Sequence, residues 1–280
     1  MSGFGELAAA DAYCRLLAAR HYENFEVASR LVPRRLRLHL ARLYAYCRTT
    51  DDLGDESGDE AVARLRRWRE EVCGLFRGEP PVHPVLVALR DSVERFGLPA
   101  RPFTDLIEAN LQDQEVTAYE SWPDLEAYCM RSAAPVGRVV LRLFGLVDPG
   151  AERLSDDVCI GLQLANFAQD VTLDAAKGRC YLLRPEVERL GVPGAVRAHC
   201  ERARALLASG RELERLASGR LRLQLALYRL GGLAICDAIA RAGYRTDLVR
   251  PRVSLPVKAA LVLKAARPGG DGRARSLGTV

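Results

Sequence analysis

The sequence comprises 280 residues, of which 49% are hydrophobic and 28% are charged. These proportions are ordinary for a globular chain with a sizeable core, so they exclude collagen-like, mucin-like and wholly disordered proteins. Charged and amide side chains interrupt the most apolar stretches, which fall short of the ~18 uninterrupted apolar residues of a membrane span. Glu6, Asp11 and Arg15 stand where a signal peptide would be apolar, so we expect a cytoplasmic protein.

The net charge of +5 conceals an uneven distribution of charge along the chain. Residues 1–174 hold 20 basic and 28 acidic side chains, whereas residues 175–280 hold 21 basic and 8 acidic ones. Such a basic C-terminal third could face nucleic acid, an anionic membrane or a phosphorylated ligand. Because aromatic side chains are not interleaved with these charges, we expect no nucleic-acid partner.

Apolar residues recur at helical spacing almost throughout, as Leu36, Leu40 and Leu43 illustrate. No convincing strand pattern is visible. Breaking residues divide the chain into helical segments of about 15–30 residues, and they stand at 80–84, 97–102, 122–123, 147–150, 184–193 and 250–256. We therefore predict one all-α domain over residues 1–266, a helical bundle, followed by a disordered tail over 267–280 that is rich in Gly and Arg.

Two pairs of aspartates stand out from this pattern. Asp51 and Asp55 are four residues apart, as are Asp170 and Asp174, so each pair lies on one face of a helix. Like charges at this spacing repel unless a cation lies between them. A solvated helix end would explain one such acidic cluster. Two clusters, however, favour a common function, and the second lies beside amides on an otherwise apolar helix.

Oxygen-only ligands suit a hard cation such as Mg²⁺, which usually bridges one or two carboxylates to the phosphates of a substrate. The pattern therefore predicts two facing helices that bind a diphosphate through Mg²⁺. The predicted metal ligands are Asp51, Asp55, Asp170 and Asp174.

These residues resemble the squalene/phytoene synthase family, whose D-x-x-x-D motifs lie on two facing helices of an isoprenoid-synthase helical bundle around a central apolar cavity. The resemblance extends over nearly the whole chain. Its further matches are His21-x-x-Asn24-Phe25, Tyr44-Ala-Tyr-Cys-Arg48, Tyr128 with Val136-Gly137, Lys177-Gly-Arg179, Arg250-Pro and Lys258.

Within the family, the chain is most similar to the hydroxysqualene synthases of bacterial hopanoid pathways, which convert presqualene diphosphate to hydroxysqualene. Members that condense two prenyl diphosphates usually have Arg in place of Gln169 and Lys in place of Glu23, both facing phosphate. The absence of these two cations favours a substrate with one diphosphate. Condensing members also tend to have Tyr near Gly232. Ala134 departs from the hydroxysqualene synthases, many of which have Asn or Asp there.

The resemblance implies that Mg²⁺, held by the four aspartates, stabilises the departing diphosphate. It implies fixed positive charge from Arg48, Arg250 and Lys258, and hydrogen bonds from His21 and Asn24. The amides implied to face the intermediate or metal are Gln163 and Asn166, and the implied walls of the cavity are Phe25, Tyr44, Tyr128, Val136, Gly137 and Leu162. Tyr44, Arg48 and Asn166 are grouped with the aspartates as catalytic.

Two alternatives stay open. One is a condensing enzyme that joins two farnesyl diphosphates into presqualene diphosphate, dehydrosqualene or squalene, or two longer prenyl diphosphates into phytoene. The other is a non-enzymatic assembly factor of the same fold, in which we would expect degenerate aspartate motifs. No nicotinamide motif is visible, which disfavours reductive closure to squalene.

The resemblance also implies pathway partners, namely a sister synthase and a hydroxysqualene reductase. A long hydrocarbon product and the basic C-terminal third suggest loose contact with the inner face of the membrane.

Overall fold

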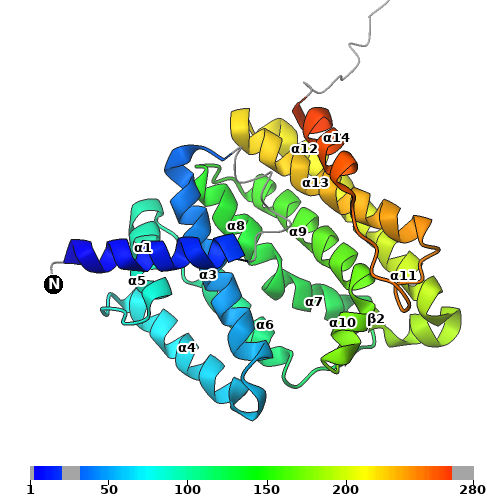
Figure 1. The fold of residues 1–280 in the computed structure, drawn as a ribbon, viewed down its shortest axis with the longest axis horizontal. Helices are drawn as coiled ribbons and strands as arrows, with labels where there is room; N and C mark the ends of the chain where they lie inside the picture. Colours follow the sequence, from blue (N-terminus) through cyan, green and yellow to red (C-terminus); the bar gives the residue numbers. More distant parts are fainter. Residues whose placement is uncertain (1–2, 21–31, 267–280) are drawn as a thin grey trace, which may run out of the picture.

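The computed structural model describes residues 3–20 and 32–266, which are helical almost throughout (Figure 1). His21, Asn24, Phe25 and the predicted tail lie outside the described residues. The elements are α1 (Gly3–Arg20), α3 (Arg34–Asp55), η1 (Gly58–Glu60), α4 (Ala61–Arg77), α5 (Pro84–Phe96), α6 (Arg101–Gln112), β1 (Ala118–Tyr119), α7 (Trp122–Ser132), α8 (Ala134–Leu143), α9 (Pro149–Gln169), α10 (Val171–Ala176), β2 (Cys180–Leu183), α11 (Arg184–Ala208), α12 (Gly210–Leu216), α13 (Gly219–Arg241) and α14 (Leu255–Ala266).

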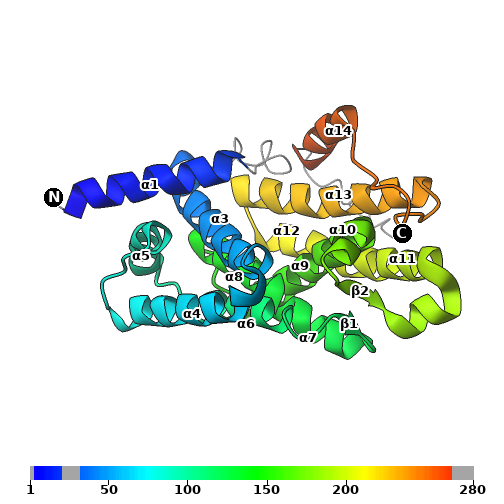
Figure 2. The same cartoon turned by 60° about the horizontal axis from the view of Figure 1, so that its bottom comes forward.

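Helices α8 and α9 join the two halves of the bundle. One apolar core is built from α1, α3, α4, α5, α6 and α8, and a second from α7, α9, α11, α13 and the short strands. Figure 2 shows α8 and α9 between these groups, with α1 and α5 toward one end and α11 toward the other. Since α8 and α9 pack against each other, the two cores belong to one all-α domain.

Proline and glycine set many of the helix boundaries. Proline occupies the first or second position of α5 to α9, where its missing N–H costs no hydrogen bond. Helices α4 and α5 end at Gly78 and Gly97, whose φ angles of 88° and 57° favour glycine. The breaks predicted at 80–84, 97–102, 147–150 and 250–256 are confirmed at the junctions between helices. The break predicted at 184–193 is confirmed as a kink, because Gly191, with φ 68° and ψ 170°, interrupts the helical conformation within α11.

Two short strands correct the expectation that no strand exists. Strands β1 and β2 form a parallel pair in which Ala118 lies opposite Cys180. They are two and four residues long, too short to produce a visible alternation of apolar and polar residues. Their pairing ties the segment after α6 to the segment after α10.

The second aspartate pair also differs from the prediction, because it does not lie on one continuous helix. Asp170 caps the end of α9 with φ −103° and ψ 20°, and Asp174 lies in the short helix α10. The backbone N–H of Asp174 still donates to the carbonyl of Asp170 at 2.9 Å. The two residues therefore keep the separation of one helical turn.

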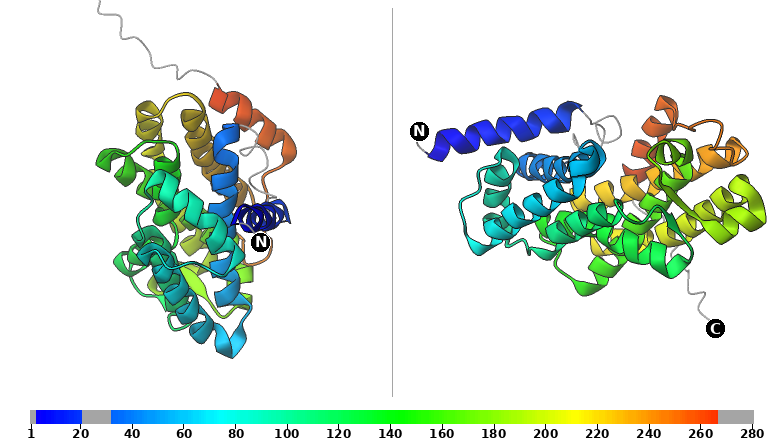
Figure 3. Two further views of the ribbon diagram at one scale, coloured as in Figure 1. Left: turned by 90° about the vertical axis from the view of Figure 1, so that its left-hand side faces the viewer. Right: turned by 90° about the horizontal axis from the view of Figure 1, so that it is seen from below.

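Helix α1 is held on the surface of the bundle by a buried arginine. Arg42 of α3 is 2% exposed and forms hydrogen bonds to both carboxylate oxygens of Asp11 at 2.7 and 3.0 Å. It also donates to Asp91 of α5 at 2.5 Å. These bonds compensate the buried charge and fasten α1, which Figure 3 shows at the margin of the molecule, to α3 and α5.

Helix α13 is long and apolar enough to cross a membrane by length and composition. However, 56% of its most apolar stretch is buried inside the structure. The core helix of a globular protein has the same property, and residues such as Leu225, Cys236 and Ile239 are indeed part of the cores.

Candidate active site

The first aspartate pair lies on the last two turns of α3, beside α6. A Cβ atom at Gly54 would come within 2.8 Å of Asn110 Oδ1, so glycine permits the two helices to approach closely. This approach brings Asn110 Nδ2 to 3.2 Å from Asp51 Oδ1, to which it donates a hydrogen bond. Asp51 and Asp55 follow each other on one face of α3.

Asp51 lies in an environment that disfavours its charge. Burial raises the pKa of Asp51 to about 6, against the opposing hydrogen bond from Asn110, and the charge of Asp55 adds to the rise. The side chain is nevertheless accessible to water. A cation bound at this carboxylate would offset the cost of its ionisation.

Asp55 connects the first motif to the second. Lys177 Nζ and Arg179 Nη1 each donate to a carboxylate oxygen of Asp55 at 2.7 Å. Burial alone would raise the pKa of Asp55, but these two bonds and charges hold it below its ordinary value. Since Lys177 and Arg179 directly follow α10, the ion pairs bring the two acidic motifs to one site.

The second aspartate pair also forms an ion pair with a basic side chain. Arg250 Nε and Nη2 donate to the two carboxylate oxygens of Asp170 at 2.5 and 3.0 Å. Asp174, which is half-buried, has no such bidentate partner among the described residues. Burial raises the pKa of Asp174 to about 7, and the neighbouring charge of Asp170 adds to the rise.

Asp113, at the end of α6, is a site residue that the sequence analysis missed. Its carboxylate accepts hydrogen bonds from Tyr128 Oη at 2.6 Å and from Tyr181 Oη at 3.0 Å. Burial raises the pKa of Asp113, and the charges of Arg179 and Asp55 also act on it. A single aspartate at a helix end shows no pattern in a sequence, so only the fold reveals this contact.

Helix α9 presents the predicted amides one and two turns before Asp170. Asn166 is exposed, and Gln163 and Leu162 are half-buried. In the described part of the chain, neither amide has a hydrogen-bonded partner. The ring of Phe167 on the same helix stacks on Tyr181 with centroids 3.9 Å apart.

The predicted residues of α3 share one stripe of the helix. Tyr44 and Arg48 lie one turn apart, and Asp51 and Asp55 continue the stripe. Arg48 Nη2 lies 2.5 Å from Asp52 Oδ1 and 3.4 Å from Glu56 Oε1. The charge of Arg48 is thus partly engaged by acidic neighbours on its own helix.

Three other predicted residues lie apart from the ion pairs. Val136 and Gly137 are on α8, and a Cβ atom at Gly137 would lie 2.5 Å from Cys159 Sγ, so this glycine permits close packing of α8 on α9. Lys258 is half-buried on α14. Within residues 3–20 and 32–266, no hydrogen bond or ion pair joins Lys258 to the aspartates, so its role stays a prediction.

The aspartates suit a divalent cation whose coordination shell is completed by oxygen atoms of a bound ligand. In residues 3–20 and 32–266, no three His, Cys, Asp or Glu side chains form a cluster that could hold a metal ion by themselves. Mg²⁺ characteristically takes one or two carboxylates and completes its shell with water and phosphate oxygens. Asp51 and Asp174, whose raised pKa values reflect uncompensated charge, provide suitable oxygen donors.

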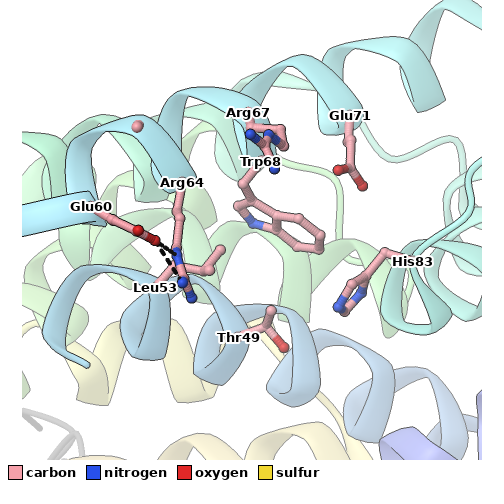
Figure 4. Close-up of a pocket in the computed structure, with 9 residues that line it drawn as sticks. Thr49, Leu53, Glu60, Arg64, Arg67, Trp68, Glu71 and His83 are labelled. Carbon is pink, nitrogen blue, oxygen red and sulfur yellow. Dashed lines mark hydrogen bonds and ion pairs between the residues drawn. The ribbon is translucent and has the colours of Figure 1, made fainter. Parts of the chain in front are cut away.

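Two cavities lie beside α4, away from the aspartates. One of about 550 Å³ is lined by Trp68, His83 and Arg67, and Figure 4 shows Thr49 and Leu53 of α3 on its wall. The other, of about 670 Å³, is lined mainly by charged side chains of α4 and α6. The first cavity is separate from the candidate site, because Thr49 and Leu53 lie on the side of α3 opposite the aspartates. None of the four aspartates lines the second cavity.

Known proteins resemble this chain in sequence and in fold. A family model described as squalene/phytoene synthase matches residues 18–258. Presqualene diphosphate synthase of Rhodopseudomonas palustris is 34% identical over 174 residues, which cover 60% of this chain and 61% of that protein. Phytoene synthase of Mycobacterium tuberculosis is 34% identical over 171 residues, or 60% of this chain and 56% of that protein. The chain thus spans about three fifths of the length of these curated relatives.

Solved structures cover more of the chain. Squalene synthase HpnC from Alicyclobacillus acidocaldarius is 43% identical, with a TM-score of 0.80 over 87% of this chain and 99% of that one. A dehydrosqualene synthase in complex with ligand has a TM-score of 0.84 over 94% of this chain and 98% of that one, at 23% identity. The second likeness bears on the fold alone.

Proposed function

Because the chain belongs to the squalene/phytoene synthase family and has an all-α isoprenoid-synthase fold, we propose that it converts presqualene diphosphate to hydroxysqualene. In this reaction the carbon–oxygen bond to the diphosphate breaks, and its electron pair leaves with the diphosphate. The resulting cyclopropylcarbinyl cation rearranges with opening of its three-membered ring, and the acyclic cation takes the oxygen of a water molecule, which releases a proton. The products are hydroxysqualene and diphosphate.

The proposal rests mainly on the environment of Gln169, which directly precedes Asp170. The residue is 8% exposed, and its Nε2 donates to the carbonyl oxygen of Pro251 at 2.5 Å. The position therefore supplies no positive charge, whereas condensing relatives usually have an arginine there. A site with fewer fixed cations favours one diphosphate over two.

The packing around Gly232 supports the same substrate. A Cβ atom at Gly232 would lie 2.8 Å from Leu162 Cδ2 and 2.9 Å from Leu207 Cδ1. The tyrosine that condensing relatives tend to have near this position would displace both leucines. Position 232 itself therefore supplies no hydroxyl group.

The side chains of the site have complementary tasks in this proposal. Asp51, Asp55, Asp170 and Asp174 would hold Mg²⁺, which when bound supplies Lewis-acid stabilisation of the departing diphosphate. Lys177, Arg179 and Arg250 add positive charge at the same place. The amides of Gln163 and Asn166 would orient the intermediate, and the rings around Tyr128 would stabilise its positive charge.

Condensation of two farnesyl diphosphates is the second candidate. The names of the curated relatives, presqualene diphosphate synthase and phytoene synthase, favour it, at 34% identity. The solved squalene synthase at 43% identity covers more of the chain but does not distinguish the two reactions by name. Both acidic motifs are complete, which disfavours a non-enzymatic assembly factor.

Identification of products tests the proposal. Purified protein with Mg²⁺ is incubated separately with presqualene diphosphate and with farnesyl diphosphate, and the extracted lipids are identified by mass spectrometry. We expect hydroxysqualene from the first incubation. Formation of presqualene diphosphate, dehydrosqualene or squalene from farnesyl diphosphate would instead support the condensing alternative.

A further inference from the structure

The outer face of α14 is apolar, although it points to solvent. We define this face by its exposed residues, which are Leu255, Pro256, Ala259, Ala260 and Leu263. Leu255 and Leu263 are 79% and 69% exposed. Figure 2 shows α14 at the margin of the molecule, over α13. A surface helix of a globular protein normally directs polar residues outward, so an exposed apolar face of this kind indicates an interaction surface.

The inner face of α14 is apolar as well. Ala265 is buried against Ala226 and Leu230 of α13, and Leu261 packs against the same small cluster. Helix α14 therefore cannot be turned over to bury its outer leucines without exposing another apolar face. In either orientation, α14 would leave an apolar face exposed to solvent.

Two exposed basic side chains, Arg252 and Lys264, flank this face in the sequence, whereas the neighbouring Arg250 is bonded to Asp170. From residue 248 to residue 266 the chain contains four basic side chains and no Asp or Glu. Arg252 in the preceding loop and Lys264 on α14 are exposed. An apolar helix face flanked by Lys and Arg suits an interface between anionic lipid head groups and their acyl chains.

We propose that the outer face of α14 docks the protein on an anionic lipid bilayer, with Leu255 and Leu263 inserted and Arg252 and Lys264 at the head groups. This inference rests on the proposed function to the extent that a long hydrocarbon substrate and product reside in a bilayer. It assigns the membrane contact to α14 rather than to α13, which is mostly buried in the cores.

A second copy of the chain fits this face less well. Helix α14 has 12 residues and is about 18 Å long, so one of its faces is small beside the ~800 Å² per partner of a stable protein interface. Two copies joined face to face would also bring like charges together. A bilayer surface has neither disadvantage.

Vesicle flotation with the full chain tests the proposal. Wild-type protein is mixed with phosphatidylcholine vesicles that contain or lack phosphatidylglycerol and is floated through a density gradient. The test variant is Leu255→Gln with Leu263→Gln, and the matched control is Val82→Gln with Val147→Gln, since Val82 and Val147 are 89% and 62% exposed on other loops. All four residues are exposed, so both variants should fold, which circular dichroism verifies.

We expect wild type and control to float with the anionic vesicles, and the test variant to bind them about 10-fold or more weakly. Lys264→Glu should weaken the binding in low salt. Equal flotation of the test variant and wild type, or no binding of wild type to anionic vesicles, would overturn the proposal. Light scattering that showed a wild-type dimer dissociated by the test variant would assign the face to a second copy instead. Flotation requires no turnover, so its outcome is independent of the proposed reaction.

Discussion

The guanidinium group of Arg250 is bonded to both carboxylate oxygens of Asp170, at 2.5 and 3.0 Å. Lys177 and Arg179 are bonded to Asp55 in a comparable way. Cations expected at the diphosphate are thus paired with carboxylates expected at the metal. We infer that these groups exchange partners on binding, so that the carboxylates turn to Mg²⁺ and the cations to the diphosphate oxygens.

Replacement of Arg250 tests this exchange. Arg250→Gln removes a charge-assisted contact worth about 1.5–3 kcal/mol, so we expect kcat/KM to fall by about 10- to 100-fold. Arg245→Gln is the control, because Arg245 pairs with Asp247 in the same loop and both lie outside the site. Steady-state kinetics of the two variants provides the comparison. Equal losses in both would show that Arg250 has no special part in turnover.

The raised pKa values of Asp51 and Asp174 predict an unusual dependence of stability on pH. A folded-state pKa of about 6 or 7, above the ordinary 3.8, means that ionisation of these carboxylates destabilises the fold. Their stabilising contribution is complete below pH 3.8 and is lost as the pH rises through 6 to 7. We expect Asp174→Asn to have a higher Tm than wild type at pH 8 in EDTA, with little difference near pH 4.

Turnover should decrease although stability increases, because Asp51→Asn and Asp174→Asn each remove a predicted metal ligand. Both variants should be folded by circular dichroism and nearly inactive with Mg²⁺. Asp59→Asn, at an exposed position of η1, serves as the control. A variant that is less stable than wild type at pH 8 would contradict the electrostatic interpretation, and one that keeps full activity would exclude that residue as a ligand.

Removal of the Asp113 carboxylate should destabilise the fold. Asp113→Ala leaves the hydroxyl groups of the buried Tyr128 and Tyr181 without this acceptor, at a cost of about 1–3 kcal/mol in the free energy of unfolding. Asp105→Ala on the same helix removes a pair with the exposed Arg101 and should cost less than ~1 kcal/mol. Urea unfolding measures both. The interpretation fails if the two variants are equally stable.

The close approach of α3 and α6 leads to a prediction for Gly54. In Gly54→Ala the new methyl group would lie 2.8 Å from Asn110 Oδ1, so the amide must move away from Asp51. We expect roughly 10-fold slower turnover with helicity unchanged. Gly231→Ala is the control, since nothing lies within 4 Å of its added atom. Unaltered turnover in Gly54→Ala would show that Asn110 does not position Asp51.

The sequence predicted the helical fold because the core positions recur with helical spacing. Leu36 and Leu43 are indeed buried on one face of α3. The strands escaped prediction because β1 has only two residues, and its pairing with β2 depends on segments far apart in the sequence. The kink at Gly191 falls within the break predicted at 184–193, although helical residues resume directly after it.

Prediction of the site was partial for a similar reason. The i, i+4 spacing identified Asp51 and Asp55, which lie on α3 as expected. It could not indicate that Asp170 ends a helix, or that Asp113 lies between the two motifs in space. Nor could it show that Lys177 and Arg250 are paired with carboxylates, because such contacts exist only after the chain has folded.

The choice of substrate rests on Gln169 and Glu23, where condensing relatives have cations. Each missing charge-assisted contact is worth about 1.5–3 kcal/mol, so two of them weaken a second diphosphate site by about 100-fold or more. Glu23→Lys combined with Gln169→Arg should therefore strengthen the binding of farnesyl diphosphate. Because Gln169 is buried against Pro251, Gln169→Arg alone is a necessary folding control.

The most direct test of the account is a competition in which the unmodified protein and Mg²⁺ receive presqualene diphosphate and farnesyl diphosphate together, with the consumption of each followed by mass spectrometry. The account predicts that presqualene diphosphate is consumed with a kcat/KM about 100-fold or more above that of farnesyl diphosphate, and that hydroxysqualene accumulates. Efficient consumption of farnesyl diphosphate, with presqualene diphosphate formed or left unused, would contradict it.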